Sequence, residues 1–222
     1  MRIGIQGGTF NPIHYGHLRG AEEVREALAL DQVRLIPSAQ PPHKPDEEIA
    51  SARDRLEMVR LAAGEHEVFV CDPMEVERGG RSFTVDTLAA LAGGACRGHE
   101  TFFIVGADAF CEVHTWSRAP RLLRMTHFGV TLRGEQRAED VIRTLERTMP
   151  PLDPSLRFEF AGENKAKVVD SDFFIHFVPI SNLEVSATQI RRRVRAGASI
   201  RYLLPRDVEL FIIRRRLYRG SS

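Results

Sequence analysis

Two histidines spaced three residues apart follow a glycine pair near the start of the chain. Gly7 and Gly8 close an apolar run typical of a β-strand, and His14 and His17 stand where a helical pattern begins. A turn between a strand and a helix binds anions, because unpaired backbone N–H groups and the positive end of the helix dipole point into it. Glycines let a phosphate approach the backbone closely, and imidazoles add donors. The spacing therefore favours a phosphate site.

The histidine pair has two other interpretations besides phosphate binding. Zinc needs further ligands, but no third ligand is evident nearby and no His-Glu-x-x-His spacing occurs. A capping or core role for the histidines stays open on local sequence. The motif Gly-x-x-x-x-Gly-Lys-Ser/Thr is absent, and Gly4, Gly7 and Gly8 do not form Gly-x-Gly-x-x-Gly. A P-loop enzyme and a plain Rossmann dehydrogenase are therefore disfavoured.

Alternating strand-like and helix-like segments must position these residues. Strand, helix and strand in succession imply a right-handed parallel crossover, and the apolar run 101–105 predicts a central strand. The pattern predicts an α/β fold with a doubly wound parallel sheet. We expect strands at 2–6, 33–37, 68–71, 101–105, 127–132, 157–160 and 173–178, and helices at 17–30, 51–64, 84–92, 119–125, 138–149, 186–196 and 206–217. The polar stretch 162–172 predicts an exposed loop or hairpin tip.

Two of the expected helices begin with capping signals. Ser51 stands three residues before Asp54, and Ser186 three residues before Gln189, as N-cap pairs do. Apolar residues in the first of these helices predict its buried stripe: Leu56, Val59, Leu61 and Ala62.

Composition bounds the class of protein. For a chain of 222 residues we expect one compact domain, 1–222, with a core at 1–180 and a helical part at 181–222. The content of 43% hydrophobic and 27% charged residues excludes a disordered chain. No apolar run is long enough to cross a bilayer and no leader pattern occurs, so we expect a cytoplasmic protein. Cys71, Cys96 and Cys111 argue against a disulfide framework or zinc knuckle. The arginine-rich end predicts solvated helix faces.

Six segments, in order along nearly the whole chain, resemble the nucleotidyltransferase superfamily that carries a His-x-Gly-His motif. Within it they resemble the bacterial nicotinate-nucleotide adenylyltransferase family. The segments are Gly7-Gly-Thr-Phe-Asn-Pro-Ile-His-Tyr-Gly-His17, Pro41-Pro-His-Lys44, Ser82-Phe-Thr-Val-Asp-Thr-Leu88, Gly106-Ala-Asp108 with Trp116 eight residues on, Val185-Ser-Ala-Thr-Gln-Ile-Arg191 and Ser199-Ile-Arg-Tyr-Leu-Leu-Pro205.

The resemblance implies a Rossmann-like fold and the transfer of AMP from ATP to nicotinate mononucleotide, with Mg²⁺ and with pyrophosphate released. In-line attack of one phosphate on another mainly needs positioning and charge neutralisation, which suits histidines and cations. By resemblance the catalytic residues are His14, His17, Lys44 and Arg191. ATP would be bound by Gly7, Gly8, Thr9, Phe10, His17, Gly106, Asp108, Ser186, Thr188 and Arg191, and the acceptor by His43, Lys44, Thr84 and Trp116.

Some of these roles have plain structural alternatives. Asp108 is equally well explained as a helix N-cap, Trp116 as a residue sealing a core edge, and Lys44 as an exposed lysine. By resemblance Trp116 would stack on the pyridine ring, and Thr84 would begin a helix whose N–H groups face the nicotinate carboxylate. A helix N-terminus prefers a carboxylate to a neutral amide, which favours nicotinate over nicotinamide.

Two departures from the family pattern and two rival functions remain. The region 150–180 looks longer than the family's usual connection, and Arg133-Gly134-Glu135 lacks the proline of the family's Arg-Pro-Gly. The nearest rival is the same transfer to nicotinamide mononucleotide or phosphopantetheine. The other is a non-catalytic nucleotide- or RNA-binding module that uses the basic tail. We expect no nucleic acid, no membrane and no protein-bound metal as partners, and leave homo-oligomerisation open.

Overall fold

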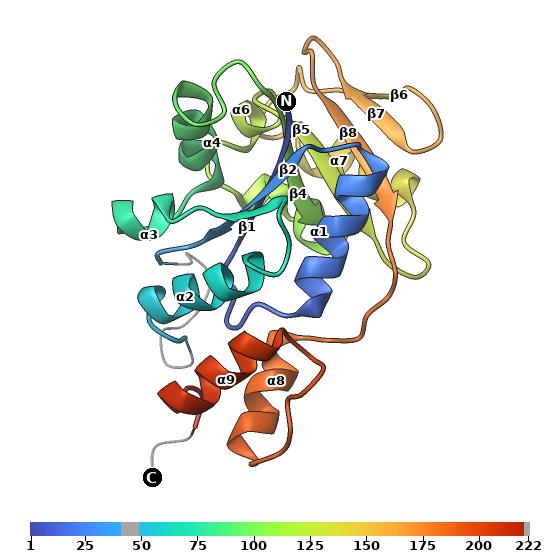
Figure 1. The fold of residues 1–222 in the computed structure, drawn as a ribbon. Coiled ribbons are helices and arrows are strands. Elements are labelled where there is room, and N and C mark those ends of the chain that lie inside the picture. Colours follow the sequence, from blue (N-terminus) through green and yellow to red (C-terminus); the bar gives the residue numbers. More distant parts are fainter. Residues whose placement is uncertain (41–48, 220–222) are drawn as a thin grey trace. The chain divides into compact units, whose positions relative to one another are not determined.

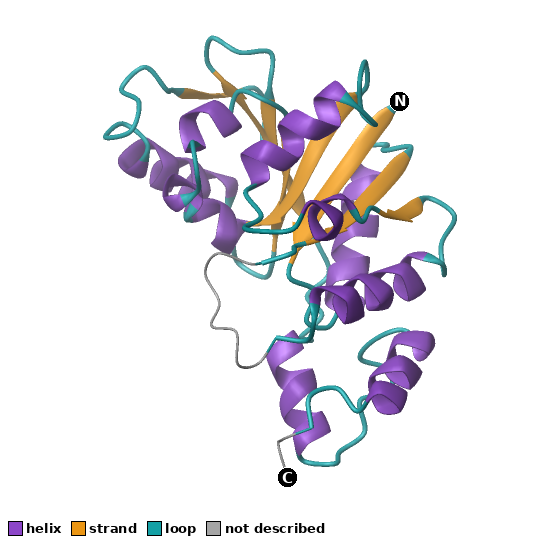
Figure 2. Ribbon diagram, turned by 90° about the vertical axis from the view of Figure 1, so that its left-hand side faces the viewer, coloured by secondary structure: helices purple, strands orange, loops and turns teal. Residues whose placement is uncertain are grey.

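The computed structural model of the protein describes residues 1–40 and 49–219 (Figure 1). Its strands, shown in orange in Figure 2, are β1 (Arg2–Gly8), β2 (Gln32–Pro37), β3 (Phe69–Cys71), β4 (Glu100–Gly106), β5 (His127–Leu132), β6 (Phe158–Phe160), β7 (Lys165–Val168) and β8 (Phe174–Pro179). The helices are α1 (Tyr15–Ala27), α2 (Ala52–Ala63), α3 (Met74–Arg78), α4 (Thr84–Gly93), α5 (Ala107–Cys111), α6 (Ala119–Leu122), α7 (Ala138–Thr148), α8 (Ala187–Arg195) and α9 (Arg206–Arg215), with a 3₁₀ turn at Val113–Thr115. None of these described helices combines the length and apolarity that a membrane span requires.

The strands form a mostly parallel sheet in the order β3-β2-β1-β4-β5-β8-β7-β6. β4 pairs in parallel with both β1 and β5, and β8 pairs in parallel with β5. Because β2 and β4 stand on opposite edges of β1, the strand order reverses there, as it does in doubly wound sheets. Helices flank the strands (Figure 2). The predicted fold class is confirmed.

The chain forms two compact units, each assembled from segments that are separate in the sequence. Unit 1 consists of 1–7, 21–33 and 83–182, and unit 2 of 8–20, 34–82 and 183–222. Unit 1 contains the apolar strands β4 and β5, and the buried ring of Phe128 on β5 packs against that of Phe110 on α5 with centroids 5.0 Å apart. The C-terminal helices therefore belong to the same unit as the turn after β1 and as α2.

One expectation about the sheet is wrong. The stretch 162–172 contains strand β7, which pairs antiparallel with β6 and β8. Ala166 and Val168 are fully buried, whereas Lys167 is exposed and Lys165 lies with its ammonium 3.9 Å from the centroid of the Phe174 ring. The segment Lys-Ala-Lys-Val does alternate with a period of two, but its polar residues and small alanine concealed the strand.

Both predicted N-caps are confirmed. The Ser51 hydroxyl accepts a hydrogen bond from Asp54 N at 3.1 Å, and the Ser186 hydroxyl accepts one from Gln189 N at 3.2 Å. The stripe predicted on α2 is only half right. Val59 and Ala62 are buried, but Leu56 and Leu61 are only half-buried, and the buried face also includes Arg55, Met58 and Ala63.

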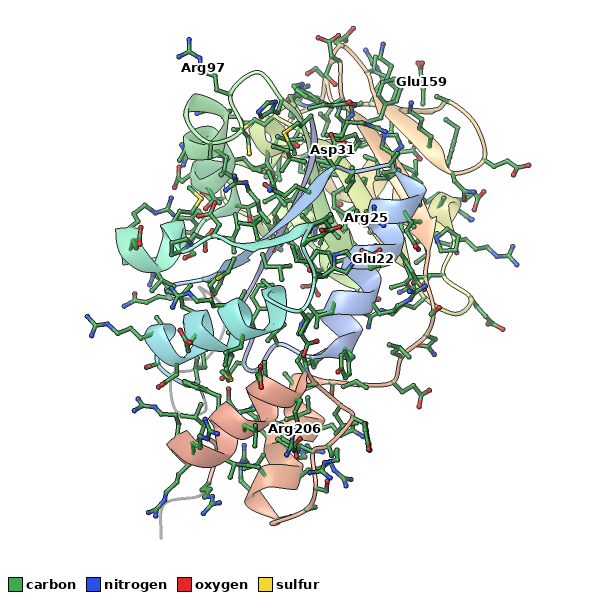
Figure 3. All side chains as sticks on the ribbon, in the orientation of Figure 1. Glu22, Arg25, Asp31, Arg97, Glu159 and Arg206 are labelled. Atoms are coloured by element: carbon green, nitrogen blue, oxygen red, sulfur yellow. The ribbon has the colours of Figure 1, made fainter. Side chains whose placement is uncertain are left out.

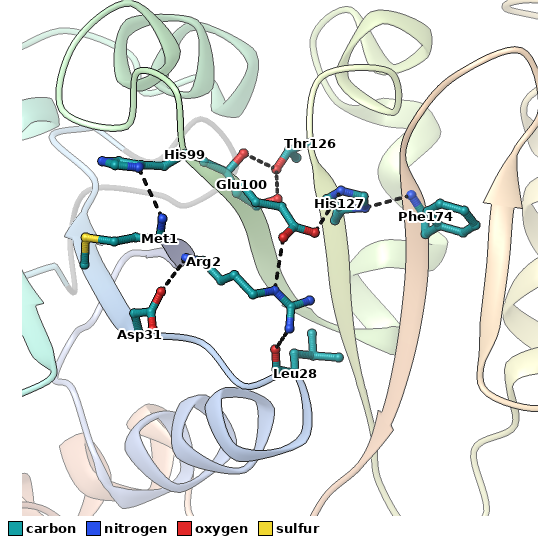
Figure 4. Close-up of polar contacts among 10 residues, drawn as sticks. Met1, Arg2, Leu28, Asp31, His99, Glu100, Thr126, His127 and Phe174 are labelled. Carbon is teal, nitrogen blue, oxygen red and sulfur yellow. Dashed lines mark hydrogen bonds and ion pairs between the residues drawn. The ribbon is translucent and has the colours of Figure 1, made fainter.

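A polar network links the first residues of several strands in unit 1 (Figure 4). The Arg2 guanidinium donates to Glu100 at 3.1 Å, and the other carboxylate oxygen of Glu100 lies 3.5 Å from Nε2 of His127. Nδ1 of His127 accepts from Phe174 N at 3.1 Å. Burial lowers the pKa of His127, and it lowers that of neighbouring His176 to about 4. These imidazoles are therefore neutral near pH 7.

The arginine-rich end of the chain lies mainly at the surface, as predicted for solvated helix faces. Arg206, labelled on α9 in Figure 3, donates to Glu209 at 2.9 Å, and Arg215 pairs with Asp54 of α2 at 3.1 Å. The exposed arginines of this region are Arg192, Arg193, Arg195, Arg201, Arg206, Arg214, Arg215, Arg216 and Arg219. Arg191 differs because it is half-buried.

Candidate active site

The turn after β1 is held by its carbonyl groups. Gly8 O accepts from Ser38 N at 2.9 Å, and Thr9 O accepts from the Arg55 guanidinium at 2.8 Å. In a trans peptide the next N–H points opposite to the carbonyl, so the N–H groups of Thr9 and Phe10 point away from these donors. Among the described residues neither N–H group donates to a protein acceptor. Two backbone donors are therefore available to an anion.

Phe10 gives the turn an unusual backbone conformation. Its φ is 47°, in the left-handed region that bulky residues rarely adopt, and its side chain is 2% exposed. Such conformations cost energy, persist only where surrounding contacts impose them, and concentrate at functional sites. The buried ring supplies these contacts, since it packs edge-on against His17 with centroids 5.2 Å apart.

The two histidines lie together where α1 begins. Their rings stack with centroids 3.8 Å apart and planes 28° apart, and His14 is buried. The backbone N of His14 donates to Nδ1 of His17 at 3.3 Å, and His14 O accepts from the backbone N of His17 at 2.9 Å. With Nδ1 of His17 an acceptor, the proton of a neutral ring is assigned to Nε2. Helix α1 begins at Tyr15, two residues earlier than expected.

The start of α8 meets the start of α1 within unit 2. A Cβ placed on Gly16 would lie 3.2 Å from Val185 O and 3.1 Å from the His14 ring, so only glycine allows this approach without displacement. The Arg191 guanidinium donates to Asn11 O in the turn at 2.9 Å and lies 3.4 Å from the Thr188 hydroxyl. Two helix N-termini, each with a partial positive charge, therefore begin beside the histidine pair.

The structure thus places one group of predicted residues around the turn in unit 2. This group consists of Gly8, Thr9, Phe10, His14, His17, Ser186, Thr188 and Arg191. Ser186 and Thr188 are exposed, and Arg191 and His17 are half-buried. Gly7, Thr84, Gly106, Asp108 and Trp116 belong to unit 1. His43 and Lys44 lie outside the described residues.

Thr84 and Trp116 occupy neighbouring parts of unit 1. Thr84 is the first residue of α4, and Trp116 follows the 3₁₀ turn with its ring edge-on to Phe103, centroids 6.2 Å apart. An ion pair between Asp86 and Arg118 joins the first turn of α4 to the segment just beyond Trp116. The indole of Trp116 is half-buried.

Asp108 is not the N-cap that local sequence allowed. Gly106 caps α5, and Asp108 is an exposed residue of the first turn. Its carboxylate accepts a hydrogen bond from Nε2 of the Gln136 side chain at 2.8 Å. Oε1 of the same side chain accepts one from Arg133 N at 2.8 Å. Gln136 directly follows Arg133-Gly134-Glu135, the segment that lacks the proline of the family's Arg-Pro-Gly. Its side chain therefore holds the Asp108 carboxylate in place.

Three residues that sequence reasoning missed hold the turn in place. Asn11 Oδ1 accepts from Ala50 N at 3.0 Å and from the Tyr218 hydroxyl at 2.8 Å. Burial raises the pKa of Tyr218, which therefore stays a neutral donor. Arg55 is the third, and one signal was present: it stands on the buried face of α2 with Met58, Val59 and Ala62. No sequence pattern links Asn11 to Tyr218.

A mostly parallel sheet whose strand order reverses at β1, with available backbone N–H groups in the turn after that strand, is typical of nucleotide-binding α/β proteins. The chain belongs to the cytidylyltransferase-like family, whose model matches residues 5–193. A probable nicotinate-nucleotide adenylyltransferase of Desulfatibacillum aliphaticivorans is 43% identical over 98% of this chain and 100% of its own length. One of Desulfitobacterium hafniense (strain Y51) is 40% identical over 98% of this chain and 96% of its own. Within its family the chain is therefore a member of the nicotinate-nucleotide adenylyltransferases, as its motifs predicted.

Solved structures support the same fold. The Plasmodium falciparum nicotinic acid mononucleotide adenylyltransferase complexed with NaAD superposes with a TM-score of 0.71 at 16% identity, covering 98% of this chain and 97% of its own. A putative nicotinate-nucleotide adenylyltransferase from Vibrio parahaemolyticus gives a TM-score of 0.60 at 16% identity, covering 99% and 96%.

Proposed function

We propose that the protein transfers AMP from ATP to nicotinate mononucleotide, forming nicotinate adenine dinucleotide and pyrophosphate. The observation that carries the site assignment is the gathering, within one unit, of two backbone N–H donors, two imidazoles, one arginine and two helix N-termini around the turn after β1. All of these groups attract anions, and such a set suits a polyphosphate.

The reaction requires placement of two phosphates and stabilisation of a leaving group. An oxygen of the acceptor phosphate attacks the α-phosphorus of ATP, the new P–O bond forms, and the bond from the α-phosphorus to the bridging oxygen breaks. Negative charge then grows on the departing pyrophosphate. Preorganised donors aimed at that charge lower the barrier without forming a covalent intermediate.

The residues around the turn after β1 take the triphosphate in this scheme. The N–H groups of Thr9 and Phe10 bind it through the backbone, and His14 and His17 donate to the bridging oxygen as charge develops. Arg191, held by Asn11 O at 2.9 Å, adds a fixed charge, and the start of α8 adds the exposed Ser186 and Thr188 hydroxyls. Gly7 and Gly8 leave room for the phosphates, and Lys44 supplies a further cation.

The two bases are assigned to residues further along the chain. Trp116, half-buried and perpendicular to Phe103, stacks on the pyridine ring. The N-terminus of α4 at Thr84 binds the nicotinate carboxylate, because the helix dipole favours an anion there. Gly106 and Asp108 contact the adenosine, and His43 contacts the acceptor. The preference for nicotinate over nicotinamide rests on the charge at the α4 terminus.

Mg²⁺ enters this scheme with the nucleotide. Within residues 1–40 and 49–219, no three His, Cys, Asp or Glu side chains cluster in a way that could hold a metal ion. The groups at the turn are backbone N–H groups, imidazoles and a guanidinium, which offer hydrogen bonds to phosphate oxygens but none of the carboxylates that Mg²⁺ prefers. Mg²⁺ commonly binds substrate phosphates and water with few protein ligands, so these residues fit a metal carried by ATP. When bound, the ion neutralises phosphate charge.

Acceptor assays test the proposal. Purified protein is given ATP and Mg²⁺ with nicotinate mononucleotide, nicotinamide mononucleotide or phosphopantetheine, and pyrophosphate release is followed. We expect the highest kcat/KM with nicotinate mononucleotide. A higher value with another acceptor would sink the assignment, and ATP or RNA binding without pyrophosphate release would favour a non-catalytic module.

A histidine variant tests the mechanism. His17→Ala should lower kcat by orders of magnitude and change ATP affinity much less, because its donation is needed mainly as charge develops. His66→Ala is the matched control, since His66 is exposed and lies outside the site. Turnover that survives His17→Ala would contradict the role given to this histidine.

A further inference from the structure

Arg55 is a buried arginine whose three guanidinium nitrogens are all used. Nη1 donates to Thr9 O at 2.8 Å, Nη2 donates to Ala39 O at 2.8 Å, and Nε donates to Ala50 O at 3.1 Å. The residue is 1% exposed. Burial of a charge is costly unless its hydrogen bonds are satisfied. Three carbonyl oxygens from three separate segments satisfy this one.

The guanidinium keeps its charge in this environment. Burial lowers the pKa of Arg55, while the nearby Tyr218 and Glu75 oppose that shift. Arginine begins so far above neutral pH that it remains protonated. No carboxylate among the described residues forms an ion pair with it. Carbonyl dipoles therefore face a full positive charge directly behind the turn.

The contact with Thr9 fixes one particular peptide. In the peptide that joins Thr9 to Phe10, the Thr9 carbonyl oxygen accepts from the guanidinium. The Phe10 N–H of the same peptide therefore points to the opposite side. A cation at the oxygen end of a peptide also polarises it and makes its N–H a stronger donor, as in hydrogen-bond chains. The polarised Thr9–Phe10 peptide thus carries a larger partial positive charge on the Phe10 N–H group.

We propose that Arg55 is a positioning residue for adenylyl transfer, acting through the Thr9–Phe10 peptide. It sets the direction of the Phe10 N–H group and strengthens it as a donor to the polyphosphate, although its own side chain is shielded from solvent and from substrate. This inference rests on the proposed function. A purely structural arginine would hold the three segments together and leave the chemistry of the folded enzyme unchanged.

Substitutions at Arg55 separate these roles. Arg55→Met keeps much of the volume and removes the charge and all three donors, whereas Arg55→Lys keeps the charge and can satisfy fewer carbonyls. Arg60→Met is the matched control, because Arg60 lies on the same helix, is exposed and pairs only with neighbouring Glu57 among the described ion pairs. Each variant is compared with the wild type for its melting curve, kcat, both KM values and affinity for inorganic pyrophosphate.

The expected pattern is a loss of kcat beyond any loss of folded protein. Per folded molecule, Arg55→Met should lower kcat by about 10- to 100-fold, since loss of one directed donor costs about 10²- to 10³-fold and here the donor is weakened and not removed. Pyrophosphate should bind about tenfold more weakly, the acceptor KM should change less than twofold, and Arg55→Lys should recover part of kcat. Arg60→Met should match the wild type.

Three results would overturn the proposal. One is an Arg55→Met protein that is folded and retains kcat within twofold of the wild type. Another is a loss of activity that follows only the folded fraction. If Arg55→Met does not fold, Arg55→Lys decides: wild-type kcat and pyrophosphate affinity in that variant count against the role. If the wild type transfers AMP to no acceptor, the proposed function fails, and weaker pyrophosphate binding in Arg55→Met still supports the role of Arg55 behind the turn.

Discussion

Replacing Gly16 with alanine perturbs the site at one defined point. The added Cβ would lie 3.1 Å from both Cε1 and Nδ1 of His14 and 3.2 Å from Val185 O. These contacts are tighter than ordinary van der Waals contact, so the neighbours must move by a few tenths of an ångström. His14 is buried against His17, which leaves its ring little room to move without shifting the pair.

The expected loss of activity follows from that displacement. Misplacing a reacting group by about 1 Å costs on the order of 100-fold in rate, so a few tenths of an ångström should cost about three- to tenfold in kcat. The stability change should be small. Alanine restricts the unfolded chain and suits a helix better, which contributes about 0.4 to 1 kcal/mol, and the tight contacts offset part of this gain.

Kinetics and melting measured on the same preparation check the prediction. Gly16→Ala should lower kcat three- to tenfold with a melting temperature close to that of the wild type. Gly93→Ala is the control, because Gly93 ends helix α4 and a Cβ there would have no heavy atom within 4 Å. Full activity in Gly16→Ala, together with a shifted His14 resonance in the NMR spectrum, would refute the link between the histidine position and rate.

Three further predictions concern other parts of the molecule. Tyr218→Phe removes the hydrogen bond to Asn11 Oδ1 and should cost about 1 kcal/mol in urea unfolding; an unchanged midpoint would show that the bond contributes nothing. His176 has a folded pKa of about 4, set by burial and then by Lys165, against 6.5 when unfolded. The unfolded chain therefore binds the extra proton, so stability should fall as pH drops from about 6.5 to 4, and His176→Gln should flatten this fall in unfolding curves across that range. Trp116→Leu should raise the acceptor KM several-fold and leave the ATP KM nearly unchanged; equal changes in both would contradict a stacking role on the pyridine.

Much of the fold could be predicted because local signals agreed with the tertiary structure. Apolar runs gave the central strands, and Ser51 and Ser186 begin their helices with the expected caps. Strand β7 was missed because its residues gain burial only by pairing with β6 and β8, which no local pattern specifies. The short helices α3 and α5 were missed for a related reason, since five-residue helices carry too little periodicity to detect.

The candidate site was predictable where chemistry and motif coincide, and not where distant segments support it. His14 and His17 stand out by residue type and spacing, and Arg191 by the family resemblance of its segment. Asn11 gains its partners from Ala50, Arg191 and Tyr218, and a hydrogen bond across 207 residues of sequence leaves no periodic trace. The roles of Thr84 and Trp116 remain predictions that the acceptor assays address.

The hydrogen bond between Asn11 and Tyr218 also sets the time during synthesis at which the turn after β1 gains its contacts. The turn after β1 leaves the ribosome before its partners Arg191 and Tyr218, which lie 180 and 207 residues further along the chain than Asn11. At about 5 to 20 residues per second, the separation of 207 residues corresponds to a delay on the order of 10 to 40 s. A nascent chain of this protein therefore carries the turn after β1 long before the residues that fix the shape of this turn have been made.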